Sequence, residues 1–258
     1  MEKVEILGCP CLVTMDEREM EEYILSLVAR KLGGYSVAIN AEKVMMFSKQ
    51  QEVKDLIKSS ILPIIDSEGA RWGIKRLYGI RYEKIDLPKL ILTIANENKL
   101  RFFLLGSKEE NNRKALDEIR KRYPNINIVG SNHGYFKDEK IMVQKLADSK
   151  AQIVLLGLGS PKQELFAHKY FNELPETIFV GGGGAINVLA GTRRRPPSHI
   201  RDNGRIPVEW LHVLITDPSM NRFKRELVLP VYFCKIFFAK IKNIILRRDM
   251  RAISAELN

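Results

Sequence analysis

Short apolar runs alternate with amphipathic stretches along most of the chain. The runs predict buried strands at residues 4–7, 35–39, 61–65, 101–105, 126–129, 153–156 and 177–180. Helical periodicity follows at residues 16–31, in a stretch that contains residues 44–47, and at 87–98, 111–123, 138–149, 160–171 and 185–191. Strands that alternate with helices predict an α/β, Rossmann-like fold, in which a parallel sheet carries helices on both faces.

The pattern changes near residue 193. The segment TRRRPPSHIRDNGRIP, which begins at Thr192, combines five arginines with three prolines and is typical of a loop or domain boundary. We therefore expect a Rossmann-like α/β domain over residues 1–192 and a basic appendage over residues 193–258. A short apolar helix is predicted at residues 208–215 of the appendage.

The appendage carries most of the positive charge. Lys and Arg outnumber Asp and Glu by 42 to 31, and residues 193–258 hold 14 basic against 6 acidic residues, a surplus of eight out of a net charge of +11. Such an excess favours an anionic partner, which could be a membrane surface, a phosphorylated lipid or a nucleic acid.

Residues 221–251 predict a basic amphipathic helix. Apolar side chains recur at helical spacing, and Lys235 and Lys242 lie one heptad apart on another face. The apolar set is Phe233, Ile236, Phe237, Ile241, Ile244 and Ile245. A basic helix rich in Phe and Ile is typical of one that lies in a membrane interface. The alternative is a helix packed on its own domain or on a second subunit.

Cysteine and histidine usage predicts neither a disulfide framework nor a structural metal site. The cysteines are odd in number, with no CxxC pair, and the four histidines lack metal-ligand spacing. A reducing cytoplasmic setting fits this usage. The first residues, MEKVEILGCPCL, do not resemble a signal peptide, and no stretch approaches 18 uncharged apolar residues, so we expect no transmembrane helix.

One strand-to-helix turn, IVLLGLGSPKQE at residues 153–164, predicts an anion site. Ser160 is expected to be the N-cap, with Pro161 at the first helical position and Gln163 completing a capping box. Free backbone N–H groups and the helix dipole at such a turn favour a diphosphate. An ordinary, well-capped turn is the alternative.

Polar residues and glycines mark other strand ends. Asn40 and Asp66 follow two predicted strands, and side chains at the carboxyl ends of strands in an open α/β sheet collect ligands, so both are expected to face one crevice. Asp66 could instead cap the next helix. Residues 181–184 are four glycines, which permit close approach of a ligand or serve as a hinge or packing site. No GxGxxG with a following acidic residue is present, which disfavours a dinucleotide dehydrogenase.

Several of these segments, in this order, resemble the WecG/TagA/CpsF family of bacterial glycosyltransferases. They are AINAEKV at 38–44, Asp66, Arg81 ahead of IDL, NIVGSNHGYF at 127–136, GLGSPKQE at 157–164, the stretch 181–191, RRPP at 194–197 and EWL at 209–211. The likeness runs from about Tyr35 to Arg225. Within the family, VAINAEK and the IVGS-to-GYF segment are most similar to the enterobacterial-common-antigen branch, which transfers N-acetylmannosaminuronic acid.

The resemblance implies an inverting, metal-independent hexosyltransferase that needs no cofactor. It would move an N-acetylmannosamine-type sugar from UDP to the 4-hydroxyl of N-acetylglucosamine on undecaprenyl diphosphate, in cell-envelope polysaccharide synthesis. Asp66 corresponds to the proposed general base and Asn40 to a residue beside it. Arg81 and Gln163 match substrate-binding positions. The basic tail would dock on the cytoplasmic face of the inner membrane as a peripheral anchor, and its Phe/Ile face also suits self-association.

The donor site implied by the resemblance comprises glycine turns, neighbouring polar residues and two arginines for the leaving UDP. It consists of Gly106, Gly134, Tyr135, Phe136, Gly157, Gly159, Ser160, Pro161, Lys162, Gln163, Glu164, Gly182, Gly183, Asn187, Arg194 and Arg195. Three positions depart from the family pattern: Ile186-Asn187 replaces Phe-Asp, Ser67 replaces Gly, and Val213 replaces Arg. These departures bear on donor choice and on any role for a carboxylate at 187.

Two other function classes are compatible with the sequence. The arginine-rich loop at 192–205 and a pI of about 9.5 would allow a nucleic-acid-binding module. Against it, aromatic residues are not interleaved with basic ones on any predicted sheet face, so no nucleic-acid partner is expected. A non-catalytic nucleotide-sugar sensor or scaffold of an envelope-polymer assembly is the second alternative, and Asn187 is the departure that favours it.

Overall fold

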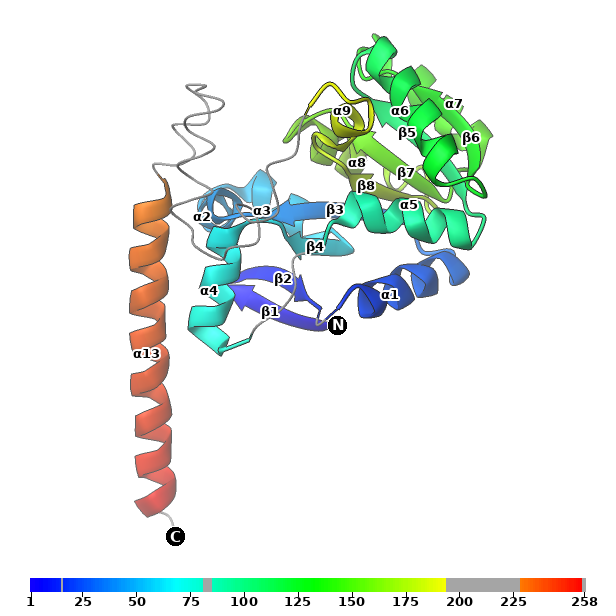
Figure 1. The fold of residues 1–258 in the computed structure, drawn as a ribbon. Helices are drawn as coiled ribbons and strands as arrows, with labels where there is room; N and C mark the ends of the chain where they lie inside the picture. Colours follow the sequence, from blue (N-terminus) through cyan, green and yellow to red (C-terminus); the bar gives the residue numbers. More distant parts are fainter. Residues whose placement is uncertain (15, 81–84, 194–227, 257–258) are drawn as a thin grey trace.

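The computed structural model describes residues 1–14, 16–80, 85–193 and 228–256, which form an eight-stranded sheet with helices on both faces (Figure 1). The sheet order is β1-β2-β4-β3-β8-β7-β5-β6, and every neighbouring pair is parallel except β1 and β2. The strands are β1 (Glu2–Ile6), β2 (Cys9–Val13), β3 (Gly34–Ile39), β4 (Leu62–Ile65), β5 (Arg101–Gly106), β6 (Asn127–Asn132), β7 (Ile153–Gly157) and β8 (Ile178–Gly181). The predicted α/β fold is confirmed.

Alternate residues of the central strands pack into two separate hydrophobic cores, one on each face of the sheet. On β5, Phe103 and Leu105 join one core, whereas Phe102 and Leu104 join the other. This follows from the period of two along a strand, and it explains why each predicted strand is a continuous apolar run. Residues of α2 (Ala41–Phe47), α3 (Gln51–Lys58), α4 (Glu68–Tyr78), α7 (Glu139–Ser149) and α8 (Lys162–Tyr170) fill the first core; residues of α1 (Glu17–Ala29), α5 (Leu87–Glu97), α6 (Glu109–Arg122) and α9 (Ala185–Leu189) fill the second.

The two halves of the sheet are joined by a short ladder. β3 and β8 pair only at Gly34 with Ile178 and at Tyr35 with Phe179. Beyond that point the hydroxyl of Ser36 accepts a hydrogen bond from the backbone N–H of Gly181 at 2.9 Å, in place of a further backbone rung. The carboxyl ends of β3 and β8 are therefore not paired with each other, and the helices that follow them, α2 and α9, lie on opposite faces of the sheet. This is the topological switch point at which open α/β sheets bind ligands.

Two elements, β2 and α3, were absent from the sequence prediction, and α4 was anticipated only as the helix that Asp66 could cap. β2 carries Pro10 and forms an antiparallel hairpin with the edge strand β1; its pairing with β4 is limited to Leu12 with Ile64, so Pro10 lies outside the β2–β4 ladder. α3 is short and polar on its outer face, with only Leu56 and Ile57 buried. Neither element offered the long periodic pattern that marked the others.

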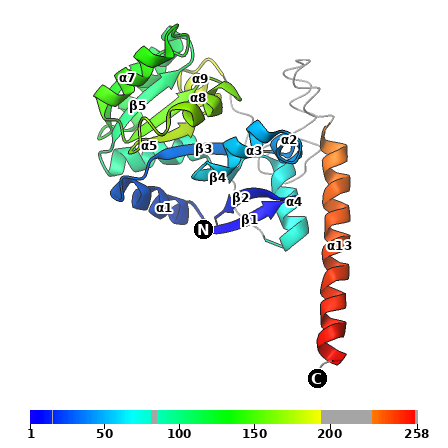
Figure 2. The ribbon, with the colours of Figure 1, turned by 180° about the vertical axis from the view of Figure 1, so that it is seen from behind.

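The C-terminal helix α13 (Val228–Glu256) packs by its first turns on α4, and Figure 2 shows its remainder extending past the sheet. Tyr232 and Ile236 are fully buried, and the ring of Phe233 meets that of Trp72 edge-on at a centroid distance of 4.8 Å. Burial raises the pKa of Tyr232, whose hydroxyl has no hydrogen-bond partner among the described residues. The predicted alternative of a helix packed on its own domain is thus correct for this part of α13.

The outer face of α13 remains apolar and basic. Val231, Phe237, Phe238 and Ile241 are exposed, as are Lys235 and Lys242. Within the described ranges, no helix is both long enough and apolar enough to cross a membrane. The predicted helix at 208–215 and the first residues of the predicted tail helix, 221–227, lie outside the described residues.

Candidate active site

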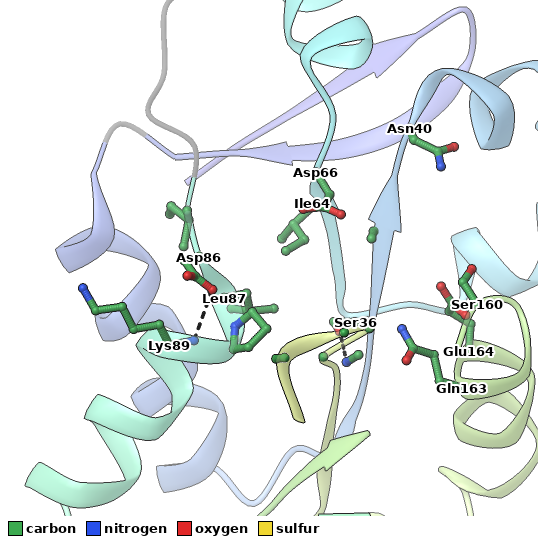
Figure 3. A pocket seen from close by; sticks show the side chains of 18 of the residues that line it. Ser36, Asn40, Ile64, Asp66, Asp86, Leu87, Lys89, Ser160, Gln163 and Glu164 are labelled. Carbon is green, nitrogen blue, oxygen red and sulfur yellow. Dashed lines mark hydrogen bonds between the residues drawn. The ribbon is translucent and has the colours of Figure 1, made fainter. Parts of the chain in front are cut away.

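A cavity of about 590 Å³ opens where β3 and β8 part (Figure 3). One wall carries the ends of β3 and β4 and the first turn of α2. The facing wall carries the start of α8 and the four glycines after β8, and the start of α5 lies on a third side. The charged and amide side chains that line this cavity include Asn40, Lys43, Asp66, Asp86, Gln163, Glu164 and Arg193.

Asn40 and Asp66 stand at the ends of neighbouring strands, as predicted. The side-chain oxygen of Asn40 accepts a hydrogen bond from the backbone N–H of Lys43 at 2.8 Å and so caps α2. Asp66 is exposed and lines the cavity. The cap of α4 is Ser67, whose hydroxyl accepts from the N–H of Ala70 at 3.2 Å. The alternative of Asp66 as that helix's N-cap is therefore wrong.

The start of α8 differs from the predicted capping box. Helix α8 begins at Lys162, and its N-cap is Pro161, without a side-chain cap. The backbone N–H of Gln163, which Ser160 was expected to cap, donates instead to the carbonyl of Gly159 at 2.8 Å. The Gly159 carbonyl therefore takes the place that the Ser160 hydroxyl was expected to fill as cap.

The Gln163 side chain lies buried against the glycine turn after β8. A Cβ added at Gly181 would come within 2.6 Å of the Gln163 amide nitrogen, so only glycine leaves room for this contact. The side-chain carbonyl oxygen of Gln163, Oε1, has no hydrogen-bond partner among the described residues. Gln163 and Ser160 face Asn40 and Asp66 from the α8 side of the cavity in Figure 3.

A second cavity, of about 530 Å³, adjoins the first and shares Gly183, Gly184 and Arg193 with it. Asn187 lines it and accepts hydrogen bonds from the Ser107 hydroxyl at 2.5 Å and the Asn111 amide at 3.1 Å. The Asn187 side chain therefore works here as a neutral acceptor between two donors.

The other predicted donor-site residues that the structure describes fall into four groups. Tyr135, Gly157 and Gly159 line the second cavity, and Tyr135 is 69% exposed. Gly106, Gly134 and Phe136 pack behind it: a Cβ at Gly106 would come within 2.5 Å of the Gly157 backbone, Gly134 lies against Gly106 and Leu158, and Phe136 meets Phe166 edge-on. Pro161 and Lys162 lie at the start of α8, with the Lys162 ammonium 5.5 Å from the Phe136 ring centre. Gly182, Gly183, Ser160 and Glu164 line the first cavity. Arg81, Arg194, Arg195 and Val213 lie outside the described residues.

Among the residues of the first cavity that were not predicted as site residues, Arg193, Asp86 and Lys43 carry charge close to the predicted ones. Arg193 lines both cavities, and its guanidinium lies over Gly184, where a Cβ would come within 2.7 Å of it. The side chain of Asp86 caps α5 and lies on the side of the cavity opposite Asn40 (Figure 3). Lys43 is buried and paired with Glu164. The basic run at 193–195 was a usable signal for Arg193, whereas Asp86 and Lys43 looked like ordinary helix-end charges.

The described residues include no group of three or more His, Cys, Asp or Glu side chains placed to hold a metal ion. The cavity itself offers a carboxylate, two amide side chains, backbone N–H groups at glycine turns and an arginine. Such a set can accept a proton from a hydroxyl and can hold an anionic, hydroxyl-rich ligand.

Comparison with known proteins identifies the same family as the sequence resemblance. A family model described as the Glycosyl transferase WecG/TagA/CpsF family matches residues 4–245. The N-acetylglucosaminyldiphosphoundecaprenol N-acetyl-beta-D-mannosaminyltransferase of Bacillus subtilis (strain 168) is 32% identical over 209 residues, which cover 80% of this chain and 79% of that protein.

Proposed function

The chain belongs to the WecG/TagA/CpsF family of glycosyltransferases, and from this premise we propose that it transfers an N-acetylmannosamine-type sugar from a UDP conjugate to N-acetylglucosamine on undecaprenyl diphosphate. One observation carries the proposal: Asn40 and Asp66 face Gln163 and the glycine turns across one cavity. The Bacillus relative's name specifies the same acceptor and an N-acetylmannosaminyl group.

In the proposed mechanism, the Asp66 carboxylate accepts the proton of the acceptor hydroxyl. The hydroxyl oxygen attacks the anomeric carbon, a new C–O bond forms on the face opposite the leaving group, and the bond to UDP breaks with its electron pair. A single displacement of this kind inverts the anomeric centre. General-base assistance of this type contributes about 10²- to 10⁴-fold to the rate.

The leaving diphosphate gains negative charge, and backbone N–H groups with arginines are the groups proposed to stabilise it. The turns at Gly159 and Gly183 adopt left-handed conformations and border the two cavities. Arg193 lies between the cavities, and Arg81, Arg194 and Arg195 remain candidates from the family resemblance. A charge-assisted hydrogen bond is about twice as strong as a neutral one, so arginine is well suited to this role. The metal-free character of the reaction is part of the proposal.

The lipid-linked acceptor places the reaction at a membrane surface. The exposed Phe237 and Phe238 with Lys235 and Lys242 on α13 support peripheral binding to an anionic membrane. The cytoplasmic face of the inner membrane is the proposed location, and self-association through the same apolar face is a second use of it.

The deciding experiment offers the purified protein a panel of UDP-sugars, including N-acetylmannosamine and N-acetylmannosaminuronic acid donors, with a synthetic prenyl-diphosphate GlcNAc acceptor. Mass spectrometry should detect the addition of one sugar to the acceptor. NMR of the product should show that the configuration at the anomeric carbon is inverted. The same panel tests the branch assignment, because VAINAEK favours the uronic-acid donor of enterobacterial common antigen synthesis. Activity that disappears in EDTA and returns with Mg²⁺ or Mn²⁺ would contradict the metal-free mechanism.

Ligand binding distinguishes the two alternative functions, a nucleic-acid-binding module and a non-catalytic nucleotide-sugar sensor or scaffold. A UDP-sugar should raise the melting temperature, whereas oligonucleotides should not. If a UDP-sugar binds but is neither hydrolysed nor transferred, the sensor or scaffold function replaces the enzyme, an outcome for which Asn187 provides the sequence argument.

A further inference from the structure

A buried ion pair crosses the first cavity. The Lys43 ammonium donates to a Glu164 carboxylate oxygen at 2.7 Å and to the carbonyl of Ala38 at 3.0 Å. The side chains of Lys43 and Glu164 are only 11% and 2% exposed. Lys43 belongs to the first turn of α2, and Glu164 to the first turn of α8, so the pair joins opposite walls.

Fold stability alone is a poor explanation for this pair. Removing two charges from water is costly, and buried pairs are often replaced by apolar residues without loss of stability. Here the second Glu164 oxygen, Oε2, has no hydrogen-bond partner among the described residues, so the desolvation of the carboxylate is only partly compensated. An unsatisfied buried polar atom calls for a specific explanation, of which a functional role is one.

The contacts of Lys43 reach the groups proposed to act on substrate. Its backbone N–H donates to the side-chain oxygen of Asn40, which fixes that amide, and its ammonium holds the end of β3 through Ala38. Glu164 follows Gln163 directly in α8, and both line the cavity. Because the ladder between β3 and β8 stops after Tyr35 and Phe179, the walls at this depth depend on side-chain ties.

We propose that the Lys43–Glu164 ion pair is a positioning pair, which sets the separation between the Asn40 and Asp66 wall and the Gln163 wall. This inference rests on the proposed function, because it concerns the alignment of the acceptor hydroxyl with the donor's anomeric carbon. Misplacement of reacting groups by about 1 Å can cost on the order of 100-fold in rate. The pair therefore acts through Asn40 and Gln163, without itself touching the reacting atoms.

The test replaces the pair with apolar residues of similar size, Lys43→Met/Glu164→Met, so that no unpaired charge remains. We expect a melting temperature equal to or above wild type, an unchanged Kd for UDP, and a kcat reduced by about 10- to 100-fold. Lys43→Arg should restore part of the rate, since it keeps the charge and a donor to Glu164. The surface pair Glu118 and Arg122, separated by 2.5 Å and lining neither cavity, supplies the control Glu118→Gln/Arg122→Gln, for which kcat should not change.

Hydrogen exchange gives a readout that needs no turnover. In the double variant the backbone amide of residue 43 should exchange faster, because the cap from Asn40 is no longer held in place. Wild-type kcat together with wild-type exchange at residue 43 would overturn the inference. If wild-type protein neither binds a UDP-sugar nor transfers one, the proposed function fails, whereas the exchange experiment still judges the positioning role.

Discussion

The backbone N–H of Asp66 donates a 3.1 Å hydrogen bond to the carbonyl oxygen of Ile39, the residue before Asn40. This bond continues the parallel pairing of β3 with β4 by one step past the last strand residues. It fixes the register of Asp66 against Asn40, and both residues line the same cavity. In the proposed mechanism, this register places the Asp66 carboxylate and the Asn40 amide on one side of the acceptor hydroxyl.

Asp66→Asn should lower turnover at least about 100-fold and leave the affinity for UDP nearly unchanged. The amide keeps the size of the side chain but cannot take up the proton of the acceptor hydroxyl. Steady-state transfer assays and calorimetric titration with UDP measure the two effects. Near-normal turnover would remove Asp66 from the role of base.

Asn40 can be separated into a capping role and a binding role by two variants. Asn40→Ser keeps a good N-cap, whereas Asn40→Ala loses it at about 1 kcal/mol of stability. We expect the melting temperature to fall only for the alanine variant, while both variants lose transfer activity about equally because both lack the amide. Full activity in Asn40→Ser would assign the residue to capping alone.

Arg193→Ala should weaken UDP binding by about tenfold, the lower end of what a charge-assisted hydrogen bond contributes. Its guanidinium lies over Gly184 between the two cavities, where the diphosphate is proposed to sit. Arg193→Lys should recover part of the affinity. Arg113, exposed on α6, is the control, and an unchanged Kd for UDP in Arg193→Ala would exclude the contact.

The packing of α13 on α4 can be tested by a substitution at Gly73. An alanine at this interior helix position would ordinarily stabilise by about 1 kcal/mol, yet its Cβ would lie 2.1 Å from the Tyr232 hydroxyl. We expect Gly73→Ala to destabilise by about 1–3 kcal/mol through overpacking. Tyr232→Phe removes the clashing, unpaired hydroxyl and should be neutral or stabilising on its own.

The double variant Gly73→Ala/Tyr232→Phe then completes the cycle. The next nearest atom of the ring is 3.2 Å from the added Cβ, so most of the Gly73→Ala penalty should disappear. Denaturant unfolding monitored by Trp72 fluorescence follows each variant. Additive effects of the two substitutions would argue that α13 does not sit in this position in solution.

Membrane binding should depend on the outer face of α13. Lys235→Gln/Lys242→Gln should reduce partitioning onto anionic vesicles by about 30-fold, at about 1 kcal/mol per lysine. Phe237→Ser/Phe238→Ser should reduce it at high salt as well, where the electrostatic part is screened. Lys121→Gln/Lys140→Gln, on α6 and α7 at the other side of the molecule in Figure 1, is the matched control. Equal vesicle binding by all three variants would leave α13 as a packing element.

Much of the fold was predictable because the central strands are buried on both faces. An unbroken apolar run such as Phe102 to Leu105 predicts a buried strand, because both faces of the strand contact a hydrophobic core. The hairpin was not predictable in the same way: β2 contains Pro10 and lies between the edge strand β1 and β4, partners that its local residues do not reveal. Helix α3 was missed because it is only eight residues long, so its core-facing residues Val53, Leu56 and Ile57 span little more than one turn.

The candidate site was predictable where a residue's position followed from strand ends. Asn40 and Asp66 were placed correctly because parallel strands end at one edge. The cap at Ser160 was predicted wrongly, since the carbonyl of Gly159 takes the Gln163 amide, a matter of backbone path that residue types do not encode. The pairing of Lys43 with Glu164 joins residues far apart in sequence, and no local pattern indicates it.

The short junction between β3 and β8 bears on how the two half-sheets would respond to a ligand. Because β3 and β8 pair at only two positions, a nucleotide-sugar bound as proposed would contact both half-sheets beyond the end of their ladder. Its binding would then stiffen the sheet, and product release would loosen it at the same junction.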